Sequence, residues 1–501
     1  MSDTPIVDTN SGLVRGRAHR GDTTLFGGIP YAAAPVNDLR FAPPHPVEPW
    51  VEPLDCQKPA PRAPQNPGIT EMLAGQTKIE WTEDCLSLNV TTGAPSESPK
   101  PVMVWIHGGG FTGGTSSIPW YDGASLASDG VVVVSINYRL GALGFLHHDT
   151  DHGVSGNNGI LDQIAALEWV RNNISAFGGD PSNVTVFGES AGAMSVGTLL
   201  AAPAAKGLFR RAILQSGAGH HVHSDDDARQ VTDAFLDLLV ERGAHDASHA
   251  TVEQILDAQN HIGDKLKDIL GDDSIGMAFQ PVIDGTNLLE RPLDAIADGS
   301  ADGIDVVAGW NLDEWDLFSI AERGDITQDS FDRRMTATFG DDSSAATVEY
   351  RDQLAGRSIN VSNRAIWNAA MTDFVFRIPA IRLLEAHTSR PGRTFGYEFG
   401  FESTAFAGRL GSCHALEIPF VFGTLDRPGV SVFLGGTSDD AEELSQIMRR
   451  GWSSFATDGD PDIEGWIDYD SNSRVTYGFD TSNSPRTDPN AATRKLWVDR
   501  R

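Results

Sequence analysis

The chain has 501 residues, 40% of them hydrophobic, and a formal net charge of −31 at pH 7. The composition is that of a globular protein, and the charge repels nucleic acids and anionic membrane surfaces, so neither is expected as a partner. The apolar run at 131–136 is far too short to span a bilayer, so no membrane insertion is expected. The absence of a secretory leader pattern, together with only three cysteines, predicts a cytoplasmic protein with reduced thiols.

The first hundred residues are rich in glycine, proline and short apolar pieces, which predicts small strands and loops. From residue 101 onward, continuous apolar runs alternate with helical and polar stretches. Strands are predicted at 101–106, 131–137, 184–187, 211–216, 304–309 and 394–399, and a helix over 161–170. Strands that are apolar on both faces and alternate with helices indicate an α/β protein with a large, mostly parallel central sheet flanked by helices.

No internal repeat, low-complexity tract or clear linker divides the chain, so residues 1–501 are predicted to form one domain. We interpret the more acidic and helical segment around 220–300 as an insertion. Because ligands of parallel sheets bind outside the carboxyl ends of the strands, the chemistry is expected to follow the strands. The positions concerned are Gly108, Ser190, Ser216, Glu314 and the loop after Phe399.

The segment G-E-S-A-G (188–192) fits the pattern G-x-S-x-G between a predicted strand and a predicted helix. In such a sharp turn the serine side chain projects from the sheet, and the flanking glycines permit close approach of neighbouring backbone. The alternative is a tight turn with a buried serine. The strand before the turn and the helix after it favour Ser190 as a nucleophile.

A nucleophilic serine needs a base, a group that orients the base, and donors for the oxyanion. The loop H-G-G-G-F (107–111) offers glycine N–H groups after a strand, and no G-K-[ST] follows that would favour a nucleotide-binding loop. The expected order of nucleophile, acid and histidine points to the D-E pair at 313–314 and then to His414. Position alone does not choose between Asp313 and Glu314.

The sequence resembles the type-B carboxylesterases, a family that includes bacterial para-nitrobenzyl esterases, animal carboxylesterases, cholinesterases and the non-catalytic neuroligins. The resemblance covers most of the chain and follows the family's order of motifs. It rests on F-G-G-I-P-Y-A (26–32), L-R-F-A-P-P (39–44), E-D-C-L-S-L-N-V (83–90), V-W-I-H-G-G-G-F (104–111), N-Y-R-L-G-A-L-G-F-L (137–146), G-N-N-G-I-L-D-Q (156–163), N-I-S-A-F-G-G-D-P (173–181), G-E-S-A-G (188–192) and H-A-L-E-I-P-F-V-F (414–422).

This resemblance implies an α/β-hydrolase fold and a role for each matching residue. The implied catalytic triad is Ser190 as nucleophile, Glu314 as acid and His414 as base. The implied oxyanion donors are the backbone N–H groups of Gly109, Gly110 and Ala191, and the implied polar residues around the triad are Glu189 and Ser216. No metal and no cofactor is implied.

The implied function is that of a serine carboxylesterase, acting through an acyl-enzyme on small to medium, fairly apolar esters. A carbamate or amide hydrolase with the same triad is the alternative among enzymes. A non-catalytic binding protein of the neuroligin kind is disfavoured, because all three triad candidates are present. The partner is then a small-molecule ester, and the sequence does not indicate an oligomeric state.

Several positions depart from the family pattern or invite a second interpretation. Trp315 stands where the family often has glycine, and we expect it, with Phe111, to contact substrate. Ala63 replaces a disulfide cysteine of some relatives, which favours a reduced, bacterial-type protein. The histidine-rich segments 147–152 and 220–223 are interpreted as polar loops without a metal, the latter close enough to the predicted site to offer a substrate contact. Structural ion pairs are implied between Arg40 and Glu83 and between Arg139 and Asp162.

Overall fold

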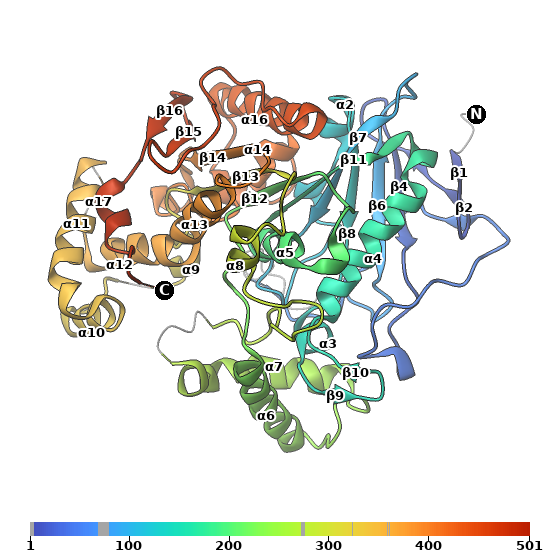
Figure 1. The fold of residues 1–501 in the computed structure, drawn as a ribbon, viewed down its shortest axis with the longest axis horizontal. Helices are drawn as coiled ribbons and strands as arrows, with labels where there is room; N and C mark the ends of the chain where they lie inside the picture. Colours follow the sequence, from blue (N-terminus) through green and yellow to red (C-terminus); the bar gives the residue numbers. More distant parts are fainter. Residues whose placement is uncertain are drawn as a thin grey trace.

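The computed structural model describes residues 5–68, 80–271, 276–322, 324–357, 359 and 361–500. An eleven-stranded sheet forms the centre of the molecule (Figure 1). Across the sheet the strands run in the order β16 (Ser484–Thr487), β15 (Val475–Phe479), β14 (Thr394–Phe399), β13 (Asp305–Asn311), β12 (Arg211–Gln215), β11 (Gly179–Glu189), β7 (Lys100–Ile106), β8 (Val132–Ile136), β6 (Ser87–Thr92), β4 (Thr24–Pro30) and β3 (Arg17–Ala18).

The strands from β15 across to β8 are parallel, and antiparallel pairs occur only toward the two edges of the described sheet. The large, mostly parallel sheet predicted from the apolar runs is therefore confirmed. Strand β11 is longer than the predicted 184–187, because it begins at the polar stretch 179–183. Apolar periodicity does not detect such a stretch, whose pairing with β7 is irregular between Gly179 and Val184.

Helices cover both faces of the sheet. Alternate residues of β7 show why: Val104 and Ile106 enter one hydrophobic core, whereas Met103 and Trp105 enter the other. The first core is covered by α4 (Asn158–Asn173), α5 (Ala191–Ala201) and α13 (Ile378–His387). The second is covered by α2 (Ala124–Ser128), α14 (Ile418–Phe422), α15 (Val430–Leu434) and α16 (Asp439–Asp458).

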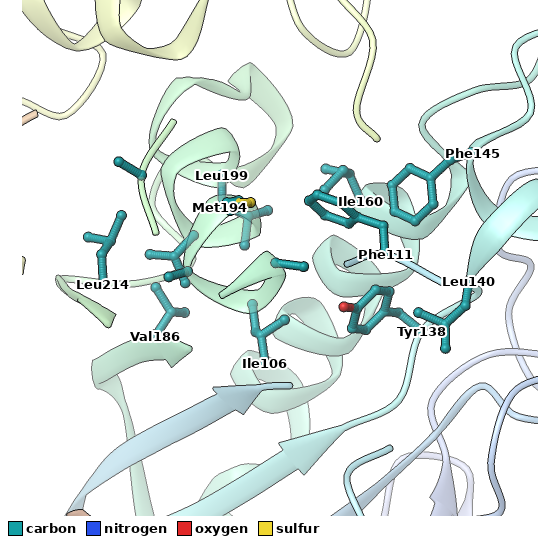
Figure 2. Close-up of a cluster of buried hydrophobic side chains, with 14 of the residues drawn as sticks. Ile106, Phe111, Tyr138, Leu140, Phe145, Ile160, Val186, Met194, Leu199 and Leu214 are labelled. Carbon is teal, nitrogen blue, oxygen red and sulfur yellow. The ribbon is translucent and has the colours of Figure 1, made fainter. Parts of the chain in front are cut away.

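Helix α5 is held at the carboxyl ends of the central strands by the first core. Figure 2 shows Ile106, Val186 and Leu214 of three adjacent strands beside Met194 and Leu199 of this helix. All five side chains are almost completely buried. The start of α5 is therefore fixed where three parallel strands end, which is the edge of such a sheet that binds ligands.

The remaining elements lie around this framework. Between β12 and β13 come α6 (Asp225–Glu241), α7 (Val252–Leu270) and α8 (Pro292–Ala297), of which α6 and α7 pack on each other away from the sheet (Figure 1). After β13 come α9 (Asp316–Ser319), α10 (Gln328–Phe339), α11 (Ser343–Gly356), α12 (Asn363–Thr372) and a π-helical turn, η6 (Asp373–Arg377), that leads directly into α13. The others are β1 (Ile6–Thr9), β2 (Gly12–Arg15), β5 (Leu54–Asp55), α3 (Gly141–Phe145), β9 (Asp149–Thr150), β10 (Gly153–Val154) and α17 (Ala491–Lys495), with short 3₁₀ turns between elements.

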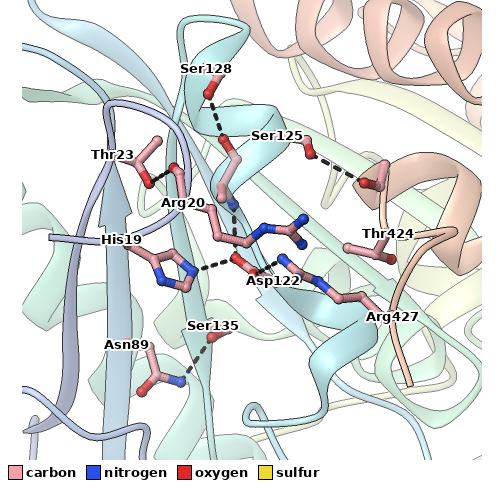
Figure 3. Close-up of polar contacts among 12 residues, drawn as sticks. His19, Arg20, Thr23, Asn89, Asp122, Ser125, Ser128, Ser135, Thr424 and Arg427 are labelled. Atoms are coloured by element: carbon pink, nitrogen blue, oxygen red, sulfur yellow. Dashed lines mark hydrogen bonds and ion pairs between the residues drawn. The ribbon is translucent and has the colours of Figure 1, made fainter. Parts of the chain in front are cut away.

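Polar contacts join segments that are far apart in the sequence. Asp122 accepts a hydrogen bond from His19 Nε2 at 2.8 Å and pairs with Arg427, and Ser125 Oγ donates to the carbonyl of Gly423 (Figure 3). The N-terminal strands and the segment after α14 are thereby tied to the loop before α2.

Both ion pairs implied by the family resemblance are confirmed. Arg40 forms two hydrogen bonds with Glu83, at 2.7 and 2.8 Å. Arg139 Nη2 and Nε lie 2.7 and 2.8 Å from the two carboxylate oxygens of Asp162, and both side chains are buried. Among the described residues, no helix is long and apolar enough to cross a membrane.

Candidate active site

Ser190 lies at the turn between β11 and α5, in a backbone conformation that side chains rarely adopt. Its φ and ψ are 57° and −127°. A Cβ on Gly192 would lie 2.0 Å from the carbonyl oxygen of Ile106, and one on Gly188 would lie 2.6 Å from the carbonyl carbon of Gly192. The two glycines therefore allow β7, β11 and α5 to meet, and their contacts hold the strained serine in place.

The glycine loop after β7 runs directly beside this turn. A Cβ on Gly108 would lie 2.9 Å from Ser190 Cβ, and Gly109 and Gly110 have positive φ values of 114° and 59°. Within the described residues neither Gly109 nor Gly110 donates its N–H to a protein acceptor. Ala191 is the first residue of α5, so its N–H also lacks an acceptor within the helix. Three candidate donors thus belong to the two segments that meet at Ser190.

Glu314 and His414 are brought together from the ends of two different strands. His414 Nδ1 lies 2.7 Å from Glu314 Oε2, and the N–H of Asn311 donates to Glu314 Oε1 at 2.8 Å. Both oxygens of this fully buried carboxylate are engaged. Of the two neighbouring acids, Glu314 contacts His414, whereas Asp313 bonds Arg357 and Ser412.

The other ring nitrogen of His414 faces Glu189. Nε2 lies 3.0 Å from Glu189 Oε1, and no hydrogen bond joins His414 to Ser190 among the described residues. Burial lowers the pKa of His414, but the charges of Glu189 and Glu314 outweigh it and raise that pKa well above its usual value. Ser216, the other predicted polar neighbour, is fully buried with a positive φ of 51°, and its hydroxyl has no partner in the part of the chain described.

A third buried carboxyl group, Glu417, lies beneath the pair. Gln215 Nε2 donates to it at 3.0 Å and Asn311 Nδ2 at 2.7 Å. Burial, and then the charges of Glu189 and Glu314, raise the pKa of Glu417 to about 8. Sequence analysis did not single out Glu417, although this residue lies three positions after His414 in the H-A-L-E segment.

Asp313 holds the loop that carries His414. It forms two hydrogen bonds with Arg357, at 2.7 and 2.8 Å, and accepts the N–H of Ser412 at 3.0 Å. The N–H of Asp313 donates in turn to the carbonyl of Ser412 at 2.9 Å. The residue next to Glu314 thus joins the acid loop to the histidine loop. Nothing in the sequence marks Arg357, which lies 44 residues from Asp313.

Aromatic rings pack against the ring of His414. Phe376 of η6 and Phe318 lie 4.6 and 5.2 Å from its ring, and Trp315 packs on Phe318 at 4.9 Å. Phe318 is 40% exposed, so this side faces solvent. Phe111 is instead fully buried against Phe145, as Figure 2 shows. Of the two aromatic residues predicted to touch substrate, Trp315 therefore lies nearer the open side.

The histidine-rich segment 147–152 forms polar contacts with residues near and far along the chain. His147 Nε2 lies 2.8 Å from Asp225, His148 Nδ1 lies 2.8 Å from Ser155 Oγ, and His152 bonds the carbonyl of Asp38. Across residues 5–500, masked positions aside, no group of three or more histidine, cysteine or acidic residues is placed to hold a metal ion.

A cavity of about 600 Å³ lies away from the predicted site. It is found at the amino ends of β11, β12 and β13, the opposite edge of the sheet, where Leu199, Lys206 and Arg210 are among its lining residues. None of the site residues predicted from the sequence lines it.

Comparison with known proteins places this geometry in a family. The carboxylesterase family model matches residues 3–497. The para-nitrobenzyl esterase of Bacillus subtilis (strain 168) is 37% identical and aligns over 98% of each chain. The fumonisin B1 esterase of Sphingopyxis macrogoltabida is 37% identical over 91% of this chain and 82% of its own. A solved thermophilic PNB esterase superposes with a TM-score of 0.86 at 35% identity, over 98% of this chain and 99% of that one.

These similarities confirm the expected fold and the expected enzyme class. The central sheet, its helices and the serine turn after β11 are those of an α/β-hydrolase. A match over nearly the whole chain leaves no large region that the family does not account for. The chain belongs to the carboxylesterase family and is a carboxylic ester hydrolase.

Proposed function

We propose that the protein is a serine carboxylesterase in which Ser190 is the nucleophile, His414 the general base and acid, and Glu314 the residue that orients His414. The observation that carries the proposal is the 2.7 Å contact between His414 Nδ1 and Glu314 beside a serine held at positive φ. A carboxylate bound to Nδ1 fixes a proton there, so that Nε2 of the neutral ring can accept the proton of Ser190 once it has left Glu189. That is the tautomer a base for Ser190 requires.

The reaction begins with a shift of His414 Nε2 from Glu189 toward Ser190 Oγ as substrate binds. Catalytic hydrogen bonds often tighten only in the substrate complex. Ser190 Oγ then attacks the ester carbonyl, and its proton passes to Nε2. His414 returns that proton to the leaving alcohol, and water, activated by the same nitrogen, releases the acid from the acyl-enzyme.

The oxyanion is stabilised by backbone donors, and no metal or cofactor takes part. We assign this role to the N–H groups of Gly109, Gly110 and Ala191, because they belong to the two segments that meet at Ser190 and have no protein acceptor in the described structure. Fixed donors of this kind contribute to the rate because they need no reorganisation when charge develops. Ser216 and Glu189 are assigned to the polar surroundings of the triad, and Trp315 to the substrate-facing side.

Covalent labelling tests the proposal directly. The protein is treated with a fluorophosphonate probe, and the adduct is located by intact mass and peptide mapping, beside turnover of p-nitrophenyl butyrate and a p-nitrobenzyl ester. We expect one adduct, on Ser190, with proportional loss of turnover. Ser190→Ala is expected to keep its fold and to lose about 10⁶-fold in kcat. Labelling elsewhere, or turnover above about 10⁻³ of wild type in this variant, would refute the assignment.

Two further points rest on the same proposal. The natural substrate is assigned only to the class of small to medium, fairly apolar esters, and comparing an ester with its matched carbamate and anilide decides whether the ester is preferred.

We also propose a single domain over residues 1–501, with 220–300 as a helical insertion, and a bacterial, cytoplasmic setting in which a small molecule, not a nucleic acid, is the partner. Support for the reduced setting comes from Cys56, Cys85 and Cys413, which are buried free thiols.

A further inference from the structure

The segment that follows β12 is pressed against the serine turn. A Cβ on Gly217 would lie 2.5 Å from the carbonyl oxygen of Ser190, and one on Gly197 of α5 would lie 2.7 Å from the nitrogen of Gly219. With Ser216 also at positive φ, this backbone has little freedom to move. The residues that come next, His220 and His221, are therefore placed by the same contacts that place Ser190.

These two histidines form a pair of half-buried rings that have buried nitrogens without a hydrogen bond of good geometry. Their ring centroids are 3.7 Å apart, at an interplanar angle of 47°. Nδ1 and Nε2 of His220 and Nε2 of His221 are buried and have no hydrogen-bond partner in the described structure. Leaving a buried polar atom unpaired is destabilising, so such atoms normally have a bound partner. Elsewhere in the same segment, His223 meets this need through Ala278 and Gln280.

The pair shares a wall with the catalytic histidine. That wall is η6, the π-helical turn, in which the backbone of Val375 interacts with both rings and partly offsets the lowering of their pKa values, and Phe376 packs 4.6 Å from the ring of His414. A buried ion pair between Asp373 and Arg377 spans the turn. Single π-helical turns inside helices occur frequently at functional sites. The pair and His414 thus lie against successive residues of η6, Val375 and Phe376.

The protonation state of the pair restricts what it can bind. Burial lowers the pKa of His221 to about 3, and burial together with the neighbouring His221 lowers that of His220 well below its usual value. Both rings are therefore neutral near pH 7, and each offers one N–H donor and one acceptor. Neutral rings complement a group that both donates and accepts, which a hydroxyl does. They are poorly suited to a carboxylate, which requires donors and favours a cation.

We propose that His220 and His221 hydrogen-bond a hydroxyl group of the substrate, so that esters of hydroxylated acids or alcohols are preferred substrates. This inference rests on the proposed esterase function, since it concerns the same catalytic centre. It assigns the pair a role in specificity and gives it no part in proton transfer. The unpaired nitrogens and their position against η6, where His414 also lies, carry it.

The test compares substrates that differ only by a polar group. Hydrolysis of ethyl butyrate, ethyl 3-hydroxybutyrate, 2-hydroxyethyl butyrate and monoethyl succinate is followed by pH-stat titration in wild type, His220→Leu and His221→Leu. We expect at least one variant to lose about tenfold more kcat/KM on a hydroxylated ester than on ethyl butyrate, which is the value of one hydrogen bond. His220→Asn, which keeps a donor and an acceptor, is expected to retain most of the preference.

Matched controls separate the possible causes of a loss. His249→Leu changes a histidine whose side chain is 85% exposed and is expected to leave all four rates unchanged. An equal loss on all four esters in the His220 and His221 variants would mean that the pair only supports the fold. An unchanged ratio, or a selective loss on monoethyl succinate, would also overturn the inference. If wild type hydrolyses none of the four esters, the proposed function itself fails, which is a different result.

Discussion

Replacing Glu314 with glutamine tests the central contact of the site with almost no change in shape. The carboxylate accepts two hydrogen bonds, from the N–H of Asn311 at 2.8 Å and from His414 Nδ1 at 2.7 Å. A carboxamide has one acceptor oxygen and one donor group, so it cannot accept both. With its oxygen on Asn311, its NH₂ group faces Nδ1, which must then become the acceptor.

That rearrangement puts the proton of His414 on Nε2, where it blocks acceptance of the proton from Ser190. The opposite orientation places two donors 2.8 Å apart at Asn311. In either case the imidazolium formed during the reaction loses its neutralising charge. A triad held in the wrong tautomer loses about 10⁴-fold in kcat, which corresponds to about 5.5 kcal/mol of barrier. KM is expected to change little, because the carboxylate is buried behind the histidine.

The assay is the steady-state hydrolysis of p-nitrophenyl butyrate, with circular dichroism to confirm folding. The adjacent acid supplies the control, since Asp313→Asn changes a carboxylate that bonds Arg357 and Ser412 instead of His414. We expect Asp313→Asn to stay within about tenfold of wild type. The reasoning is refuted if Glu314→Gln retains more than about a tenth of wild-type kcat, or if Asp313→Asn is impaired as severely.

Other substitutions test other contacts of the site. Burial lowers the pKa of His414, but the charges of Glu189 and Glu314 raise it by more than burial lowers it. The base form of His414 is lost as pH falls through this raised pKa. Glu189→Gln should therefore lower the pKa and move the acid limb of the kcat/KM profile to lower pH, and an unmoved limb would contradict this. Arg357→Met should lower kcat about fivefold with little change in KM, because Asp313 loses its bidentate partner, and Arg357→Lys should recover part of the loss. Gly192→Ala should lower the urea midpoint by an amount equivalent to about 1–3 kcal/mol or more, since its Cβ would lie 2.0 Å from the last carbonyl oxygen of β7, and an unchanged midpoint would show that the turn can relax.

Much of the framework follows from the sequence alone, because it depends on local patterns. Continuous apolar runs predicted the parallel strands, since strands covered on both faces need no polar side. The glycines around Ser190 predicted a close approach of backbone, which the position of Ile106 beside Gly192 bears out. Such signals lie within a few residues of one another and can be recognised without knowledge of the fold. The family resemblance added the enzyme class and the two ion pairs, which spacing could not supply.

Tertiary structure decided the contacts between distant residues. Asp313 and Glu314 are neighbours of equal charge, and only the packing of the loop after β14 turns one toward His414 and the other toward Arg357. The elevated pKa of Glu417 likewise depends on carboxylates from three separate segments meeting in one buried volume. No local pattern encodes such a meeting, because electrostatic coupling depends on distance in space and not on separation along the chain.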